Sequence, residues 1–149
     1  MTNNILEILG KVLLTVLLTG LIGGEREIRH KGAGLRTHIL VGVGSTLIVL
    51  TSFHVSDIYR NVTFVDPSRM IAGVITGIGF LCAGTIIRGG KQIVGLTTAA
   101  TLWIVSGVGI AVGCDHYSAA IIVTVVVFMV LICLRSIEAR LEKHFHYTI

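Results

Sequence analysis

Five apolar runs, each 17 to 19 residues long and separated by short polar connections, limit most strongly what this chain can fold into. At 1.5 Å per residue, a helix of this length crosses most of a hydrocarbon core about 30 Å thick. The runs lack the alternating pattern of about ten residues that is typical of a membrane β-barrel. The sequence therefore predicts an all-α, polytopic membrane protein with a single domain, residues 1–134, and a short tail, 135–149. The expected spans are 5–22, 37–55, 70–87, 96–112 and 117–134.

The charge content agrees with this class of protein. Only 13% of the residues are charged, against about 25% in soluble proteins. This value excludes a soluble globular domain, a disordered chain and a coiled coil. The single proline excludes collagen and Pro/Gly linkers, so the 18 glycines are expected inside packed transmembrane helices.

The positions of the basic residues predict the orientation of the bundle. Nine of the twelve Lys and Arg residues flank the spans on one side if the N-terminus lies outside the cell. The positive-inside rule then predicts an N-out, C-in topology. The net charge of +4 is explained in this way, and no nucleic-acid partner is expected.

The third span carries a run of small residues. Gly73 and Gly77 form a G-x-x-x-G motif, and Gly79, Ala83 and Gly84 continue it. The first interpretation is close packing against another helix, and the alternative is a groove in which a substrate or ion touches backbone carbonyls. In the fourth span, Trp103 lies about two turns from the start and is expected at a helix contact.

Polar residues at the span ends supply further candidates. Asp66 precedes Pro67, a combination typical of a helix N-terminus, and Asp66 is also a candidate outer contact for a cation or a helix. Thr97 and Thr98 are expected to bond to backbone carbonyls or, alternatively, to line a polar cavity.

The connection after the first span holds four basic residues. It is interpreted as a solvated inner loop or, more specifically, as a network in which Glu25 pairs with Arg36 or Arg88. The histidines and cysteines lack metal-ligand spacing, so no metal and no cofactor are expected. No nucleophile motif is present, so the chain is not expected to be an enzyme. No Asp, Glu, Lys or Arg lies at the middle of a span, which disfavours a proton relay.

A weak internal repeat is visible at an offset of 61 residues. Gly34 aligns with Gly95, Leu35 with Leu96, and further matches are Gly23 with Gly84 and Thr37 with Thr98. A direct duplication of a helical hairpin and a coincidence among glycine-rich segments both account for these matches.

Together these motifs resemble the MgtC/SapB family of bacterial membrane proteins over residues 21–117. The matching segments are Gly24 to Glu27, Gly34 to His38, Asp66 to Arg69, Gly77 to Arg88 and Gly95 to Trp103. Cys82 departs from the family pattern, which has glycine there, and is expected to loosen close packing.

The resemblance implies a multi-pass protein of the bacterial plasma membrane with about five spans. Family members are linked to growth in low magnesium, acid stress and survival in host cells. The functional candidates that the motifs imply are Glu25, Arg26, Arg36, Asp66, Arg69, Arg88, Thr97 and Thr98. Many members continue into a soluble ACT-like domain, for which about 15 residues after the fifth span leave no room.

Two functions remain open at this stage. The first is regulation of other membrane proteins during adaptation to Mg²⁺ limitation, acid or host-cell stress. The second is a transporter or channel for Mg²⁺ or another small ion. The expected partners are the lipid bilayer, other membrane proteins and a second copy of the chain, because a twofold dimer is the commonest assembly.

The predicted topology can be tested with a reporter fused to the C-terminus. A fluorescent protein should fold and emit there, and alkaline phosphatase should be inactive, because the charge distribution places this end inside the cell. Active phosphatase at the C-terminus would reverse the orientation.

Overall fold

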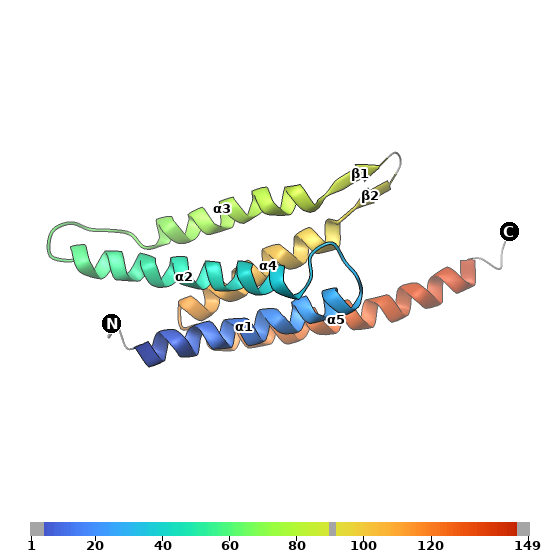
Figure 1. The fold of residues 1–149 in the computed structure, drawn as a ribbon, viewed down its shortest axis with the longest axis horizontal. Helices are drawn as coiled ribbons and strands as arrows, with labels where there is room; N and C mark the ends of the chain where they lie inside the picture. Colours follow the sequence, from blue (N-terminus) through green and yellow to red (C-terminus); the bar gives the residue numbers. More distant parts are fainter. Residues whose placement is uncertain (1–4, 90–91, 146–149) are drawn as a thin grey trace.

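The computed structural model describes residues 5–89 and 92–145, which form five helices and one short hairpin. Figure 1 shows long helices side by side, with α3 on one flank and α5 on the other. Four of the helices are long and apolar enough to cross a membrane, and α5 contains a shorter apolar stretch, Tyr117–Cys133. The predicted all-α polytopic fold is confirmed. The helices are α1 (Ile5–Ile28), α2 (Leu35–Tyr59), α3 (Ser68–Thr85), α4 (Leu96–Gly113) and α5 (Tyr117–Phe145).

The helices extend beyond several predicted span ends. The helix α1 continues six residues past the expected end of the first span and includes Glu25 and Arg26. The helix α5 continues through most of the segment predicted as a tail, and residues 146–149 lie outside the described residues. Charged residues therefore occupy helix ends where the sequence predicted loops.

The connection between α3 and α4 contains the strands that the sequence did not predict. The strands β1 (Ile87–Gly89) and β2 (Gln92–Val94) pair in antiparallel register, with Ile87 opposite Val94. β-branched residues on both sides of a Gly-Gly pair favour a hairpin over a continued helix. As a result, α3 ends at Thr85, two residues before the predicted span end.

Gly95 joins the hairpin to α4 in a conformation that requires glycine. Its φ is +95°, in the left-handed region, where a side chain is strained. A Cβ at this position would also overlap the carbonyl oxygen of Thr85. The close passage of the chain under the end of α3 thus depends on this residue.

The tightest helix contact joins α2 to α4. A Cβ on Gly109 of α4 would overlap the carbonyl oxygen of Gly42 in α2. One turn further along α4, a Cβ on Gly113 would lie 2.7 Å from the side chain of Val49. Because these glycines carry no side chain, the two backbones approach closely, as in other small-residue contacts in membranes.

The predicted packing role of the third-span glycines is not found within the chain. A Cβ on any of Gly73, Gly77, Gly79 or Gly84 would meet no atom within 4 Å, and Ala83 is exposed. Trp103 was also expected at a helix contact, but 55% of its surface is exposed. The reason is that α3 lies at the edge of the bundle and Trp103 projects from the outer side of α4. Cys82, which is expected to loosen close packing, donates a hydrogen bond of 3.2 Å from its Sγ to the carbonyl oxygen of Ala99 in α4.

The structure places residues aligned by the 61-residue repeat at equivalent positions. Gly34 and Gly95 precede α2 and α4, and Leu35 and Leu96 begin these helices. The hydroxyls of Ser45 and Ser106, also 61 residues apart, lie 3.0 Å from each other. The helices α1 and α3 each pack against both α2 and α4. Exchanging α1 with α3 and α2 with α4 preserves this pattern, so the four helices have an approximate twofold arrangement with its axis between α2 and α4.

The Gly42–Gly109 contact generates a prediction about stability. Gly109→Leu should destabilise the folded bundle by about 1–3 kcal/mol, because the new side chain forces α2 and α4 apart. The measurement is unfolding in mixed micelles by denaturant titration. The matched control is Gly107→Leu in the same helix, where a Cβ would meet nothing within 4 Å. Equal stability of the two variants would contradict the assigned contact.

Candidate functional site

A column of polar side chains runs through the interior of the bundle between α1, α2 and α4. All members of this polar seam are fully or nearly fully buried. Apart from the adjacent Ser45 and Thr46, they are spaced one to two turns apart along each helix, among apolar residues. The seam consists of Thr15, Thr19, His38, Ser45, Thr46, Thr101 and Ser106.

The centre of the seam joins all three helices. Thr15 Oγ1 in α1 lies 2.9 Å from Thr46 Oγ1 in α2. Thr46 Oγ1 in turn donates to the carbonyl oxygen of Gly109 in α4, at 2.9 Å. The threonine hydroxyl reaches this carbonyl because α2 and α4 approach so closely at Gly42. The hydrogen bonds therefore lie where the backbones are nearest to each other.

His38 forms the end of the seam near the loop between α1 and α2. Its Nδ1 lies 2.8 Å from the carbonyl oxygen of Gly34, which only accepts, so Nδ1 carries a hydrogen. Its Nε2 lies 3.0 Å from Thr101 Oγ1, and that hydroxyl also donates to the carbonyl oxygen of Thr98. When the ring is neutral, Nε2 accepts the single hydroxyl hydrogen of Thr101, and the bond from Thr101 to the Thr98 carbonyl is lost. When the ring is protonated, Nε2 donates to the Thr101 oxygen, and the Thr101 hydroxyl donates to the Thr98 carbonyl at the same time.

The candidate pair Glu25 and Arg26 is buried rather than solvated. About 6% of each side chain is exposed. Glu25 contacts Arg26 at 3.3 Å and Arg29 at 3.4 Å. The sequence predicted that Glu25 pairs with Arg36 or Arg88, but among the described residues it pairs with neither. The prediction was wrong because α1 continues through Glu25 and places its cationic partners on the same helix.

Arg26 lies on the face of α1 that continues the seam. Its Nη1 contacts Glu25, while its Nε is buried and has no hydrogen-bond partner in the described part of the chain. A buried guanidinium is costly unless it is paired, so this end of the seam holds one incompletely satisfied cation.

Lys11 begins the seam at its other end, and only 2% of its side chain is exposed. Its Nζ lies 2.9 Å from Asp115 in the α4–α5 loop and 3.2 Å from Glu7. Partial burial works to raise the pKa of Asp115, but hydrogen bonds from Tyr117 and Lys11 outweigh it and hold the pKa below its usual value. The cation thus ties α1 to the start of α5.

The remaining candidates lie apart from the seam, with one exception. Asp66 is at the end of the bundle away from Glu25, where its carboxylate accepts the Ser68 N–H at 2.9 Å. Hydrogen bonds from Ser68 lower the pKa of Asp66. The helix α3 is assigned from Ser68, but Asp66 makes the capping contact that the sequence predicts.

Four further candidates are exposed, namely Arg36, Arg69, Arg88 and Thr97. The exception is Thr98, which is buried and whose carbonyl oxygen accepts a hydrogen bond from the Thr101 hydroxyl.

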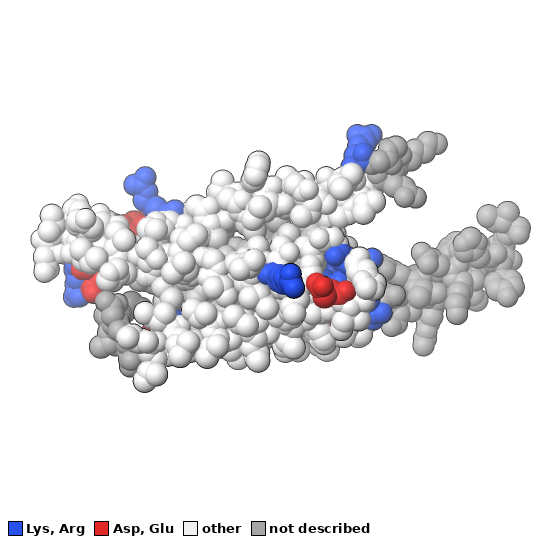
Figure 2. Space-filling view, viewed as in Figure 1, with Lys and Arg blue, Asp and Glu red and all other residues white. Residues whose placement is uncertain are grey.

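Figure 2 shows a broad uncharged band on the visible face, with the charged residues toward the two ends of the described bundle. Among the side chains that the structure describes, no group of three or more His, Cys, Asp or Glu is placed to hold a metal ion.

The hydroxyls of the seam are the buried polar residues that sequence reasoning missed. Thr15 and Thr19 are four residues apart in the first span, and Ser45 and Thr46 are adjacent in the second, which also holds Thr51 and Ser52. Helical spacing of hydroxyls in apolar runs is the signal that was available. It does not tell which hydroxyls face another helix and which face lipid.

Helices of membrane length around a largely hydrogen-bonded polar interior define a multi-pass membrane protein. The MgtC family profile matches residues 12–140 of the chain. The chain therefore belongs to the MgtC family.

Several bacterial proteins are similar to this chain. YhiD of Escherichia coli K12, whose name associates it with magnesium transport, is 39% identical over 94% of this chain and 66% of its own length. The MgtC proteins of Salmonella typhimurium 14028s and Brucella abortus are 38% and 44% identical over 89% and 85% of this chain, and over 54% and 50% of their own lengths. The chain spans about half to two thirds of the length of these relatives. No solved structure matches it.

The His38 contacts generate a prediction about proton positions and stability. Nitrogen-15 NMR of the labelled ring should show a proton on Nδ1 at neutral pH, because Nδ1 faces only a carbonyl. Thr101→Val should cost about 1 kcal/mol of stability, since it removes the hydroxyl between His38 and Thr98. Thr97→Val is the matched control, because Thr97 is exposed in the same helical turn. A proton on Nε2 alone would contradict the assigned geometry.

Proposed function

We propose that this protein is a regulator in the bacterial plasma membrane that acts by binding other membrane proteins. It supports adaptation to Mg²⁺ limitation, acid or host-cell stress and carries out no enzymatic reaction. Membership of the MgtC family and the magnesium-related name of YhiD support the link to magnesium.

The observation that carries this proposal is the hydrogen bonding of the seam. Thr15, Thr46 and Ser45 each bond to another helix or to their own backbone. Such hydroxyls stabilise helix contacts without needing an ion or substrate. Hydrated Mg²⁺ needs a wide path, because it loses its water reluctantly.

Large side chains on the outer surface provide contacts for a membrane partner. Phe80 on α3 is 84% exposed, and Trp103 on α4 is 55% exposed. Aromatic side chains frequently carry much of the binding energy at protein interfaces. In this proposal, the outer surface carries the function and the seam holds the bundle together.

The alternative function is transport of Mg²⁺ or another small ion. It is favoured by the polar column itself, which has Lys11 and Asp115 at one end and Glu25 and Arg26 at the other. In this case the seam hydroxyls line a path that opens in another conformation, so their replacement should change ion flux.

Two sets of variants distinguish these functions. In a strain without the native gene, growth in low magnesium is measured with wild type, Phe80→Ala, Trp103→Ala and Thr46→Val at matched membrane abundance. Regulation predicts that the aromatic variants lose rescue and the recovery of crosslinked partners, whereas Thr46→Val retains both. Leu17→Ala is the control for loss of an exposed apolar side chain, because Leu17 is 61% exposed on α1.

The transport alternative is tested with purified protein in vesicles that contain a magnesium-sensitive dye. Flux that depends on the protein and changes in Thr46→Val would overturn the regulatory proposal. Full rescue by both aromatic variants would also count against it.

A further inference from the structure

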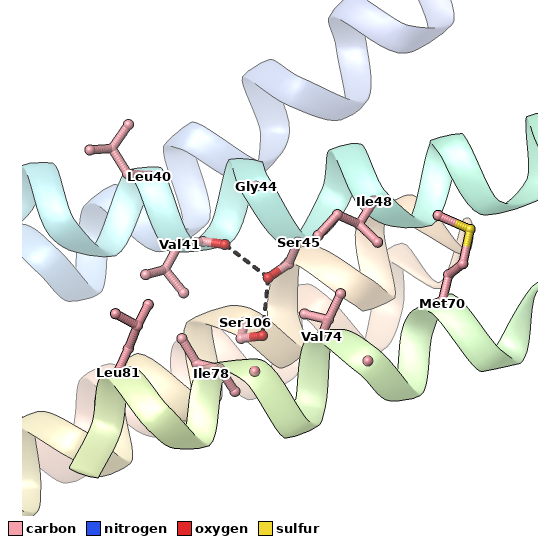
Figure 3. Close-up of a pocket in the computed structure, with 12 residues that line it drawn as sticks. Leu40, Val41, Gly44, Ser45, Ile48, Met70, Val74, Ile78, Leu81 and Ser106 are labelled. Atoms are coloured by element: carbon pink, nitrogen blue, oxygen red, sulfur yellow. Dashed lines mark hydrogen bonds between the residues drawn. The ribbon is translucent and has the colours of Figure 1, made fainter. Parts of the chain in front are cut away.

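The helix α3 is largely uncovered, with only Ile78 buried among its 18 residues. Between α3 and α2 lies an open groove with a volume of about 620 Å³. Figure 3 shows Ser45 and Ser106 at the floor of this groove, hydrogen bonded to each other. The remaining lining is apolar or glycine, and none of the lining residues is charged. The groove therefore suits an apolar occupant.

The size of the groove matches one face of a helix. It extends along α3 from Met70 to Leu81, which is about 16 Å at the rise of an α-helix. Half of a helical cylinder about 10 Å wide fills roughly 650 Å³ over that length. A Cβ on Gly44, Gly73 or Gly77 would meet nothing within 4 Å, so these lining residues leave room for the backbone of a neighbour.

The approximate twofold arrangement indicates what kind of element belongs there. The helix α5 packs against α1 and α4. Exchanging α1 with α3 and α4 with α2 converts this position into the groove between α3 and α2. The apolar helix α5 thus covers one of two related positions, and the other is open in the single chain.

A second copy of the chain can supply the missing helix in a closed assembly. If α5 of the second copy entered the groove, the contact would join different surfaces, because α5 and the groove lie on opposite sides of the bundle. Such heterologous contacts lead to rings or open arrays. Contact between two identical grooves closes as a twofold dimer, with the two α3 helices parallel and crossing at their G-x-x-x-G motifs.

We propose that two copies form a twofold dimer in which α3 of each copy lies in the α2–α3 groove of the other. Gly73 and Gly77 lie at the crossing, and Gly44 faces the incoming helix from α2. The dimer does not depend on the proposed regulatory function. An oligomer measurement therefore tests it separately.

The first test is disulfide crosslinking in native membranes. Cys82, Cys114 and Cys133 are replaced by serine or alanine, and single cysteines are introduced by Gly73→Cys, Gly77→Cys, Gly79→Cys or Val126→Cys. The dimer predicts that the cysteine at position 73 or 77 forms a crosslinked dimer on mild oxidation. The cysteine at position 79 should not, because Gly79 is equally open but does not line the groove.

The second test measures assembly without cysteines. Labelled full-length protein is diluted in lipid vesicles, and the number of copies per complex is counted by photobleaching. Gly77→Ile should weaken dimerisation about tenfold or more, because its side chain fills the crossing point. Gly79→Ile is the matched control and should dimerise like wild type, and melting curves verify that both variants fold.

Several results would overturn the proposed dimer. A wild-type protein that is monomeric at all lipid dilutions excludes it. A dimer that survives Gly77→Ile, or that crosslinks through position 79, uses another face of α3. Crosslinking through Val126 of α5, with higher assemblies, identifies the heterologous arrangement instead.

Discussion

The close approach of α2 and α4 at Gly42 and Gly109 is the contact on which the rest of the bundle depends. Lipid tails are as apolar as leucine, so burial of apolar side chains alone does not hold transmembrane helices together. Short backbone distances and interhelical hydrogen bonds supply the attraction instead. The Thr46 hydroxyl uses the short distance to reach the Gly109 carbonyl and, through Thr15, connects α1 to the same point.

The lipid environment also explains why the buried charges at the two ends of the seam are paired. An ion taken out of water needs a partner, and both Lys11 and Arg26 find carboxylates at hydrogen-bonding distance. Lys11 reaches across to the α4–α5 loop and fixes α1 against α5. Arg26 remains within α1 and keeps one buried nitrogen without a partner in the described residues. The two ends therefore differ: one is a link between helices, and the other is a charged pair within one helix.

The glycines show how far sequence reasoning extended. The G-x-x-x-G motif of the third span predicted close helix packing, yet within the chain Gly73 and Gly77 face open space. Of the glycines in contact, Gly109 forms a second G-x-x-x-G motif with Gly113, which sequence reasoning did not single out, and Gly42 belongs to none. Spacing tells that two small residues share a helix face, but it does not tell which face another helix covers. For the same reason, the pairing predicted for Glu25 was wrong, since it depended on where α1 ends.

The sequence by itself determined the membrane class, the approximate spans, the repeat spacing and the family, because these follow from the length of apolar runs and from local motifs. A helix needs about 20 apolar residues to cross a bilayer wherever it packs. Only the tertiary structure decided that the hydroxyls of Thr15, Ser45 and Thr46 form a buried seam, and that α3 is left largely uncovered. Those features depend on how helices rotate about their axes and which neighbours they meet. The mean hydropathy of a helix is the same whichever face points inward. The rotation of each helix is therefore fixed only by packing between segments that are distant in the sequence.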